Sequence, residues 1–296
     1  MTAGWIASCV ALVGCAGVGP DEPWVPIEMI DGPLATEQQP PPQPRDPGPV
    51  VRVVTWNLDE ENNTGPDALA AAILGDPALA TADVFIFQEE ESYPEEGSSR
   101  SSRLAALLDV GYVYVPARTK GDGTHGLAIM SAYPLANVQE MKLPATRGDA
   151  RIAVEADVVV GALTLHVIDV HLETYVDAQQ RVLQLRPAVI DAGSPVLVSG
   201  DFNMGWLQWP ASYVPIVSGS SASDQSAVID SYMHALGFDE PTTNSGPTSH
   251  AFGEDARLDA IYPRGLDVAF GAVEHVGPSD HWPMWLDVTG PSAVRR

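Results

Sequence analysis

Two polar side chains, Asp201 and Asn203, follow a short apolar segment of the chain. The segment, 196–199, is short, rich in β-formers and bounded by Pro195 and Gly200, which predicts a buried strand. Residues two apart on an extended chain project to the same side, so both polar groups would point beyond the strand end. The carboxylate can take a proton or orient a water, and the amide offers a donor and an acceptor. Alone, such a pair is more often a simple turn.

The same arrangement recurs along most of the chain. At six places a predicted strand is bordered by carboxylate, amide or imidazole side chains: Asn57 and Asp59, Glu89, His171, Asp201 and Asn203, Asp259, and Asp280 with His281. Strands that bring such groups to one edge of a sheet build a polar pocket there. Six occurrences are hard to explain as unrelated turns, and they favour a chemical site over the turn interpretation.

Short strands and helices would position these groups. The helix predicted over 178–189 has apolar side chains spaced four, three and four residues apart. Other helices are expected over 67–74, around 104–108 and near 226–236, and the region 204–257 is otherwise rich in loops. Strands are expected at 51–56, 84–87, 112–115, 126–131, 152–160, 163–170, 196–199, 258–262 and 283–288.

Seven segments resemble, in order and approximate spacing, those of the endonuclease/exonuclease/phosphatase superfamily. They are 55–59, 88–89, 126–131 with 133–135, 170–172, 200–203, 257–261 and 279–281. The combination is specific, although no single segment is. The family includes pancreatic-type deoxyribonucleases, abasic-site endonucleases, neutral sphingomyelinases and inositol polyphosphate phosphatases. The resemblance implies an α/β fold, a four-layer sandwich of two packed, mainly antiparallel sheets flanked by helices, with the site at one edge.

The resemblance also implies a metal-dependent phosphodiesterase. Glu89 would be the main metal ligand, with Asn57 and Asp280 as further ligands, and Asp59 matches an acidic position near the second metal of some members. Both cysteines lie within the first fifteen residues, so the domain has no thiolate site. Oxygen ligands suit Mg²⁺, with Mn²⁺ or Ca²⁺ as alternatives.

By the same resemblance, Asp201 would orient or deprotonate the attacking water, and Asn203 would steady the water or the phosphate. His281 would contact the phosphate and transfer a proton, with Asp259 holding its other ring nitrogen. His171 would be a second imidazole near the leaving group.

Arg151 matches a family arginine that binds the scissile phosphate. Its alternative is a surface ion pair with Asp149 or Glu155. The aromatic residue that commonly follows the motif aspartate is replaced by Ala260, a departure that concerns packing more than chemistry. The remaining histidines match no motif and are interpreted as surface or structural: His125, His166, His234, His250 and His275.

The substrate stays open between a nucleic acid and a phospholipid. A formal net charge of −24 opposes nucleic acid at long range, and no basic cluster is evident. The expected activity is an endonuclease-like phosphodiesterase. The alternatives are a sphingomyelinase or phospholipase C-type enzyme, an inositol phosphate phosphatase, or a tethered binding module without turnover. Trp206 and Trp209 could meet lipid or belong to the core. No obligate protein partner is evident.

The N-terminal region resembles an export signal of a lipoprotein. Residues 1–19 are apolar, and 12–15 resemble a bacterial lipobox that would place a lipid on Cys15. No Lys or Arg precedes the apolar run, so a cleaved soluble form or a buried helix are alternatives. A linker at 20–49, in which ten of thirty residues are proline, would join this anchor to a domain at 50–290 and a tail at 291–296. The protein is therefore expected in the cell envelope, at the outer membrane or cell surface, or else secreted.

Overall fold

The computed structural model describes residues 36–59, 65–144, 149–174, 176–208, 213–215, 225–250 and 255–291, with the backbone alone for 206–208 and 213–215. The expected export signal, Cys15, the residues 292–296 of the expected tail, and the side chains of Trp206 and Trp209 lie outside these described parts. Among the helices that are described, none combines the length and the apolar character needed to span a bilayer.

The larger sheet has seven strands in the order β1-β4-β5-β3-β2-β14-β13. Within it, β2 and β3 run parallel, and the other neighbouring strands are antiparallel. The strands are β1 (Glu37–Gln39), β2 (Val51–Asn57), β3 (Val84–Ser92), β4 (Gly111–Lys120), β5 (Gly123–Ser131), β13 (Asp267–Val273) and β14 (Met284–Thr289).

The second sheet has five strands in the order β12-β9-β8-β7-β6, with β8 and β9 parallel. They are β6 (Leu135–Lys142), β7 (Ile152–Val160), β8 (Leu163–His171), β9 (Val196–Asp201) and β12 (Asp259–Arg264). A separate short hairpin joins β10 (Trp206–Gln208) to β11 (Tyr213–Pro215).

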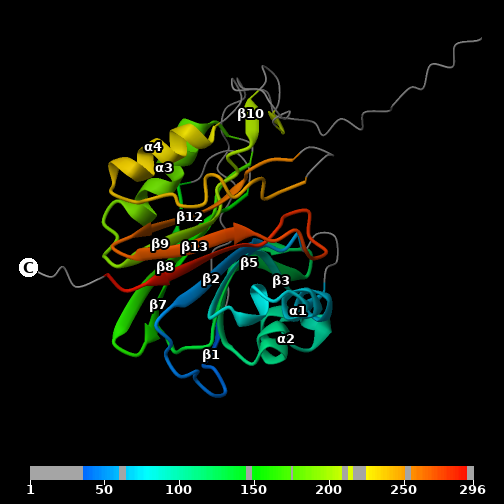
Figure 1. Ribbon diagram of the computed structural model, residues 1–296. Coiled ribbons are helices and arrows are strands. Elements are labelled where there is room, and N and C mark those ends of the chain that lie inside the picture. The colour runs from blue at the N-terminus through cyan, green and yellow to red at the C-terminus, as the bar shows by residue number, and fades with distance from the viewer. Residues whose placement is uncertain are drawn as a thin grey trace, which may run out of the picture.

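The two sheets pack face to face, and helices cover their outer faces (Figure 1). Alternating side chains of both sheets, such as Val53, Ile86 and Val167, form the apolar layer between them. On the larger sheet lie α1 (Pro66–Gly75) and α2 (Arg100–Leu108), and on the smaller sheet α3 (Ala178–Val189) and α4 (Ser226–Ala235). The expected four-layer α/β sandwich of two mainly antiparallel sheets is confirmed, and each sheet contains one parallel pair of strands.

The parallel pairs explain why distant residues meet. In β2 and β3, Asn57 is in register with Gln88, and in β8 and β9, His171 is in register with Asp201. The carboxyl ends of each parallel pair therefore lie at one edge of their sheet. In the antiparallel pair of β9 and β12, Asp259 lies opposite Asp201. The strand ends at this edge carry the polar residues singled out in the sequence.

Two local backbone features shape this edge. A β-bulge in β3 lies between Gln88 and Glu90, and the residue inside it, Glu89, has a φ of +59°. Gly200 has a φ of +143°, and a Cβ there would lie 1.9 Å from the carbonyl oxygen of Val170. Only glycine lets β9 approach β8 so closely immediately before Asp201.

Several elements differ from those expected. Part of the proline-rich linker, β1, pairs with β4 along an edge of the sheet, since its extended conformation already suits strand pairing. The described part of that linker therefore packs on the domain that was expected to start at residue 50. Strand β3 extends to Ser92 and α2 begins at Arg100, so both elements reach beyond the strand expected at 84–87 and the helix expected around 104–108. Strands β6 and β13 were not predicted, and the burial pattern of neither strand contains a fully buried residue.

Candidate active site

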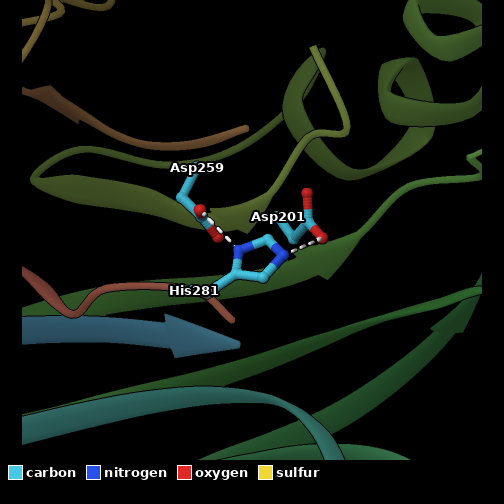
Figure 2. Close-up of side chains that lie close together, drawn as sticks. All are labelled: Asp201, Asp259 and His281. Atoms are coloured by element: carbon cyan, nitrogen blue, oxygen red, sulfur yellow. Dashed lines mark hydrogen bonds and ion pairs between the residues drawn. The ribbon is translucent and has the colours of Figure 1, made fainter. Parts of the chain in front are cut away.

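Three side chains form a row at the end of the second sheet. The Nδ1 of His281 lies 2.8 Å from Oδ2 of Asp259, and its Nε2 lies 3.9 Å from Oδ2 of Asp201 (Figure 2). All three side chains are buried. The imidazole therefore has one nitrogen held by a carboxylate and the other directed toward a second carboxylate.

The backbone of His281 is tied to the neighbouring sheet. The indole Nε1 of Trp56 donates to the carbonyl oxygen of His281 at 2.9 Å. The hydroxyl of Ser279 donates to the carbonyl oxygen of Asn57 at 2.7 Å and accepts from the His281 N–H at 2.9 Å. These bonds fix the loop before β14 to the end of β2, so the imidazole has a defined position.

Asn57 connects the two sheets. Its amide nitrogen lies 3.1 Å from Oε1 of Glu89 and 3.0 Å from Oδ2 of Asp201, so it donates toward both carboxylates. The Nε2 of His171 lies 3.5 Å from Oδ2 of Asp201 and 3.8 Å from Oε1 of Glu89. Asp201 Oδ2 is therefore the point on which Asn57, His171 and His281 converge.

Asn203 supports Asp201 from the following turn. Its N–H donates to Oδ1 of Asp201 at 2.8 Å, and its side-chain amide donates to the carbonyl oxygen of Leu172 at 2.8 Å. Its φ is +51°, a conformation that Asn adopts more readily than most residues. The turn interpretation of this pair is thus correct for the backbone, and the same turn holds one oxygen of Asp201 in place.

The surroundings of His281 and Asp201 raise the pKa values of both groups. Burial opposes the charged imidazole of His281, but the charge and hydrogen bond of Asp259, with Asp201 and Asp280, raise its pKa to about 10. Burial and the charge of Asp259 raise the pKa of Asp201 to about 7, against the opposing effect of His281 and two hydrogen bonds. His281 is therefore charged at neutral pH, and Asp201 titrates there.

Asp280 and His171, which lie next to His281 and Asp201, also have shifted pKa values. Burial raises the pKa of Asp280, whose Oδ1 lies 3.9 Å from Nε2 of His281. Burial lowers the pKa of His171 well below its usual range, and the positive charge of Arg151 adds to this. The charges that raise the pKa of His281 are thus carboxylates, whereas positive charges help to lower the pKa of His171.

The residues present fit a divalent cation. Asp201, Asp259 and His281 offer ligand atoms within 4.8 Å of one another and form a possible metal site, and the buried Oδ1 of Asp259 has no hydrogen-bond partner in the described part of the chain. Glu89 and Asp280 add carboxylates beside them. Clustered carboxylates with raised pKa values are stabilised by a bound cation, and their oxygens are ligands that Mg²⁺ accepts.

Comparison with known families identifies this arrangement. The chain matches the Endonuclease/Exonuclease/phosphatase family over residues 54–281. The chain belongs to this family. Its members are hydrolases that act on phosphodiester bonds and use divalent metals. No curated protein sequence gives a significant match to the chain.

Solved structures of endonuclease/exonuclease/phosphatase proteins share the fold. A family protein from Beutenbergia cavernae has 22% identity and a TM-score of 0.63, with 83% of this chain and 73% of that chain covered. One from Leptotrichia buccalis has 14% identity and a TM-score of 0.62, covering 80% and 99%. D. rerio TDP2 complexed with single strand DNA product has 17% identity and a TM-score of 0.58, covering 82% and 100%. At these identities the likeness concerns the fold alone.

The fold brings most of the residues expected from the family motifs into one network. Contacts within 4 Å link Asn57, Glu89, His171, Asp201, Asp259, Asp280 and His281, and Asn203 is bonded to Asp201. Asp59 follows β2, and its N–H donates to Oδ1 of Asn57 at 3.0 Å.

Arg151 lies at the edge of this network. Its Nε donates to Glu173 at 3.3 Å, so neither Asp149 nor Glu155, the partners considered from the sequence, holds it. It lines a pocket together with His171. Its place beside the family site is thus established, while its contact with substrate stays a prediction.

Two features were missed from the sequence. His125, interpreted as surface or structural, is 4% exposed and lines the same pocket as Arg151 and His171. Its alternation with Leu127 and Ile129, which face the apolar layer between the sheets, was the available signal. Ser279 lies in the motif segment 279–281 but had no expected role, and its hydroxyl joins the end of β2 to the loop before β14.

Proposed function

We propose that this protein is a metal-dependent phosphodiesterase with endonuclease-like chemistry. The observation that carries the proposal is the convergence of Asn57, His171 and His281 on one buried oxygen of Asp201. A base, a charged imidazole and an amide donor around one small space are what phosphoryl transfer to water requires. The shared fold and the family membership support the same reaction class.

Asp201 would act as the general base. A group whose pKa is about 7 is half deprotonated at neutral pH, where it can take a proton from an attacking water. The hydrogen bond from the Asn203 N–H leaves Oδ2 directed at the site. The water oxygen would bond to phosphorus as the ester bond to the leaving oxygen breaks, and Asp201 would receive the water proton.

His281 would bind a non-bridging phosphoryl oxygen as a cation. Asp259 keeps it charged and oriented through the 2.8 Å bond to Nδ1, so Nε2 presents an N–H to the substrate. His171, which burial keeps neutral, would hydrogen-bond near the leaving oxygen without adding a charge. Asn203 would steady the water or phosphate through Asp201.

A bound Mg²⁺ would stabilise negative charge on the phosphoryl and leaving oxygens. We assign its ligands to Glu89 and Asp280, with Asn57 and Asp201 beside them. His281 is the poorer ligand of the possible metal site, because Asp259 and its high pKa keep it protonated and a ligating imidazole must be neutral.

The test is hydrolysis of bis-p-nitrophenyl phosphate by the full chain, with and without Mg²⁺. We expect turnover that requires the metal and falls at least about 10³-fold in Asp201→Asn and about 10²-fold in His281→Ala. His166→Ala is the matched control, because His166 lies on β8 at the end away from the site. Activity that survives Asp201→Asn, or an inactive wild type that binds metal normally, would refute the proposal.

A further inference from the structure

A buried histidine without an assigned role lies beside the proposed site. His125, on β5, is 4% exposed, and its Nε2 has no hydrogen-bond partner among the described residues. It lines a small pocket together with Arg151 and His171. A buried polar atom without a partner is destabilising, so this nitrogen is arranged to meet a ligand or a water.

The backbone holds His125 firmly at this place. Arg118 on β4 lies directly opposite His125 on β5, across a register shift between Pro116 and Arg118. The next residue, Gly126, approaches β4 so closely that a Cβ would lie 2.1 Å from the carbonyl oxygen of Val115. The imidazole therefore projects from a rigid hairpin toward the pocket, and Arg118 accompanies it.

The pocket's electrostatics favour an anion. Burial lowers the pKa of His125 well below its usual range, and the positive charges of Arg118, Arg151 and Lys120 lower it further. Arg118 is paired with the half-exposed Asp149, and Arg151 with Glu173. A neutral imidazole among these groups can donate its N–H to an anionic oxygen without repelling the arginines.

The position of the pocket indicates which anion. The scissile phosphate would lie at Asp201, and His171 lies between Asp201 and the pocket, with its Nε2 3.5 Å from the carboxylate. The pocket thus lies next to the proposed place of the reacting phosphate, beyond His171. A choline headgroup is a cation and would meet Arg118 and Arg151 there, whereas the next phosphate of a nucleic acid strand would be attracted.

We propose that His125, together with Arg118, binds the phosphate that flanks the scissile bond of a nucleic acid strand, next to Arg151, which is expected at the scissile phosphate itself. This inference rests on the proposed phosphodiesterase function and narrows its substrate class. His125 is a substrate-positioning residue in this assignment, since it touches the neighbouring phosphate and not the reacting atoms.

The experiment uses the trinucleotide dTpTpT and two analogues in which one linkage is a neutral methylphosphonate, on either the 5′ or the 3′ side. Each analogue has a single cleavable bond, so kcat/KM reports the effect of the flanking charge. Wild type is expected to cleave one of the analogues about tenfold more slowly per bond than dTpTpT, the loss of one phosphate contact.

His125→Leu should lower kcat/KM on dTpTpT by the same factor and remove the difference between dTpTpT and that analogue. His125→Asn keeps a donor and should retain part of the difference. Both variants should hydrolyse bis-p-nitrophenyl phosphate within about twofold of wild type, as should the control His166→Leu. Thermal melting identifies a variant that fails to fold, and the near-isosteric His125→Asn then carries the test.

The inference is overturned if wild type has the same kcat/KM per bond on both methylphosphonate analogues as on dTpTpT. It is also overturned if His125→Leu slows the hydrolysis of all substrates equally, or if sphingomyelin is hydrolysed faster than dTpTpT. These outcomes differ from failure of the proposed function, in which wild type would not hydrolyse bis-p-nitrophenyl phosphate at all.

Discussion

Replacing the proposed base should stabilise the metal-free protein while it abolishes activity. The raised pKa of Asp201 means that the fold disfavours its ionised form, chiefly because the side chain is buried and lies beside Asp259. Asp201→Asn removes this charge. A gain of stability with a loss of activity is expected when the replaced residue is retained for function at the expense of stability, whereas replacement of a structural residue lowers stability.

The magnitude follows from the shift. The pKa rises from 3.8 to about 7, and one unit corresponds to about 1.4 kcal/mol, which gives an upper bound of about 4 kcal/mol. The amide can accept only one of the two hydrogen bonds that Asn57 and the Asn203 N–H now donate, which costs about 1–3 kcal/mol. His281 also loses a stabilising charge 3.9 Å away but keeps its bond to Asp259. We expect a net gain of about 1–2 kcal/mol.

The sign depends on pH in a defined way. Because the folded pKa of Asp201 lies above the unfolded value, its ionisation destabilises the wild type as pH rises from about 4 to above 7. Asp201→Asn lacks this loss, so its advantage should grow across that window and then level off. At pH 4 the variant should be no more stable than wild type.

Urea unfolding in EDTA at pH 4, 6 and 8 measures this difference, with Mg²⁺ added in a parallel series. The cation should stabilise wild type more than the variant, since a carboxylate near the ligands is missing. A variant that is destabilised at pH 8 without metal, or a difference independent of pH, would refute the argument that burial of this charge is costly.

Three further changes test other parts of the structure. Asp259→Asn removes the main charge that raises the pKa of His281, so the alkaline limb of the pH profile of kcat/KM should move to lower pH. Stopped-time assays across pH 6–10 should also show a rate at pH 8 that is about 10–100-fold lower. An unshifted alkaline limb would argue against a requirement for the protonated form of His281. Gly200→Ala should lower the free energy of unfolding in urea by more than about 2 kcal/mol, because a Cβ would lie 1.9 Å from the Val170 carbonyl oxygen. The control Gly193→Ala should change this free energy little, because no described atom beyond its chain neighbours lies within 4 Å of the added Cβ. Cys15→Ser should abolish incorporation of labelled palmitate in a bacterial host if residues 12–15 are a lipobox, and a wild type that takes up no label would contradict the expected lipoprotein and envelope location.

The catalytic edge could be predicted from the sequence because each motif is local. A strand end followed by Asp201 and Asn203, or by His171, shows its periodicity and its polar residues within a few positions. The parallel pairing of β2 with β3 and of β8 with β9 then brings these ends together. Once the family segments are aligned in order, the strand pairing and the meeting of the ends follow.

The remaining parts depend on contacts that no local pattern reports. Strand β1 lies in a proline-rich segment whose composition indicates a spacer, and only pairing with β4 makes it part of the sheet. Exposed strands such as β13 lack alternation because neither face is buried. His125 looks like any other histidine in the sequence, and its proposed role depends on the opposite strand and on Arg151, which lies 26 positions later in the sequence.

The distribution of charge around Asp201 explains how so acidic a protein could bind a polyanion. Asp259 and Asp280 lie on the side of His281, where a cation would offset them. Arg118, Arg151 and His125 lie beyond His171 on the other side. A strand that entered with its reacting phosphate at Asp201 would place its neighbouring phosphate toward the arginines, because the opposite direction leads to carboxylates. The net charge of −24 repels nucleic acid at a distance, but within a Debye length of about 8 Å at physiological salt the charges nearest a bound strand would matter most and would set its direction.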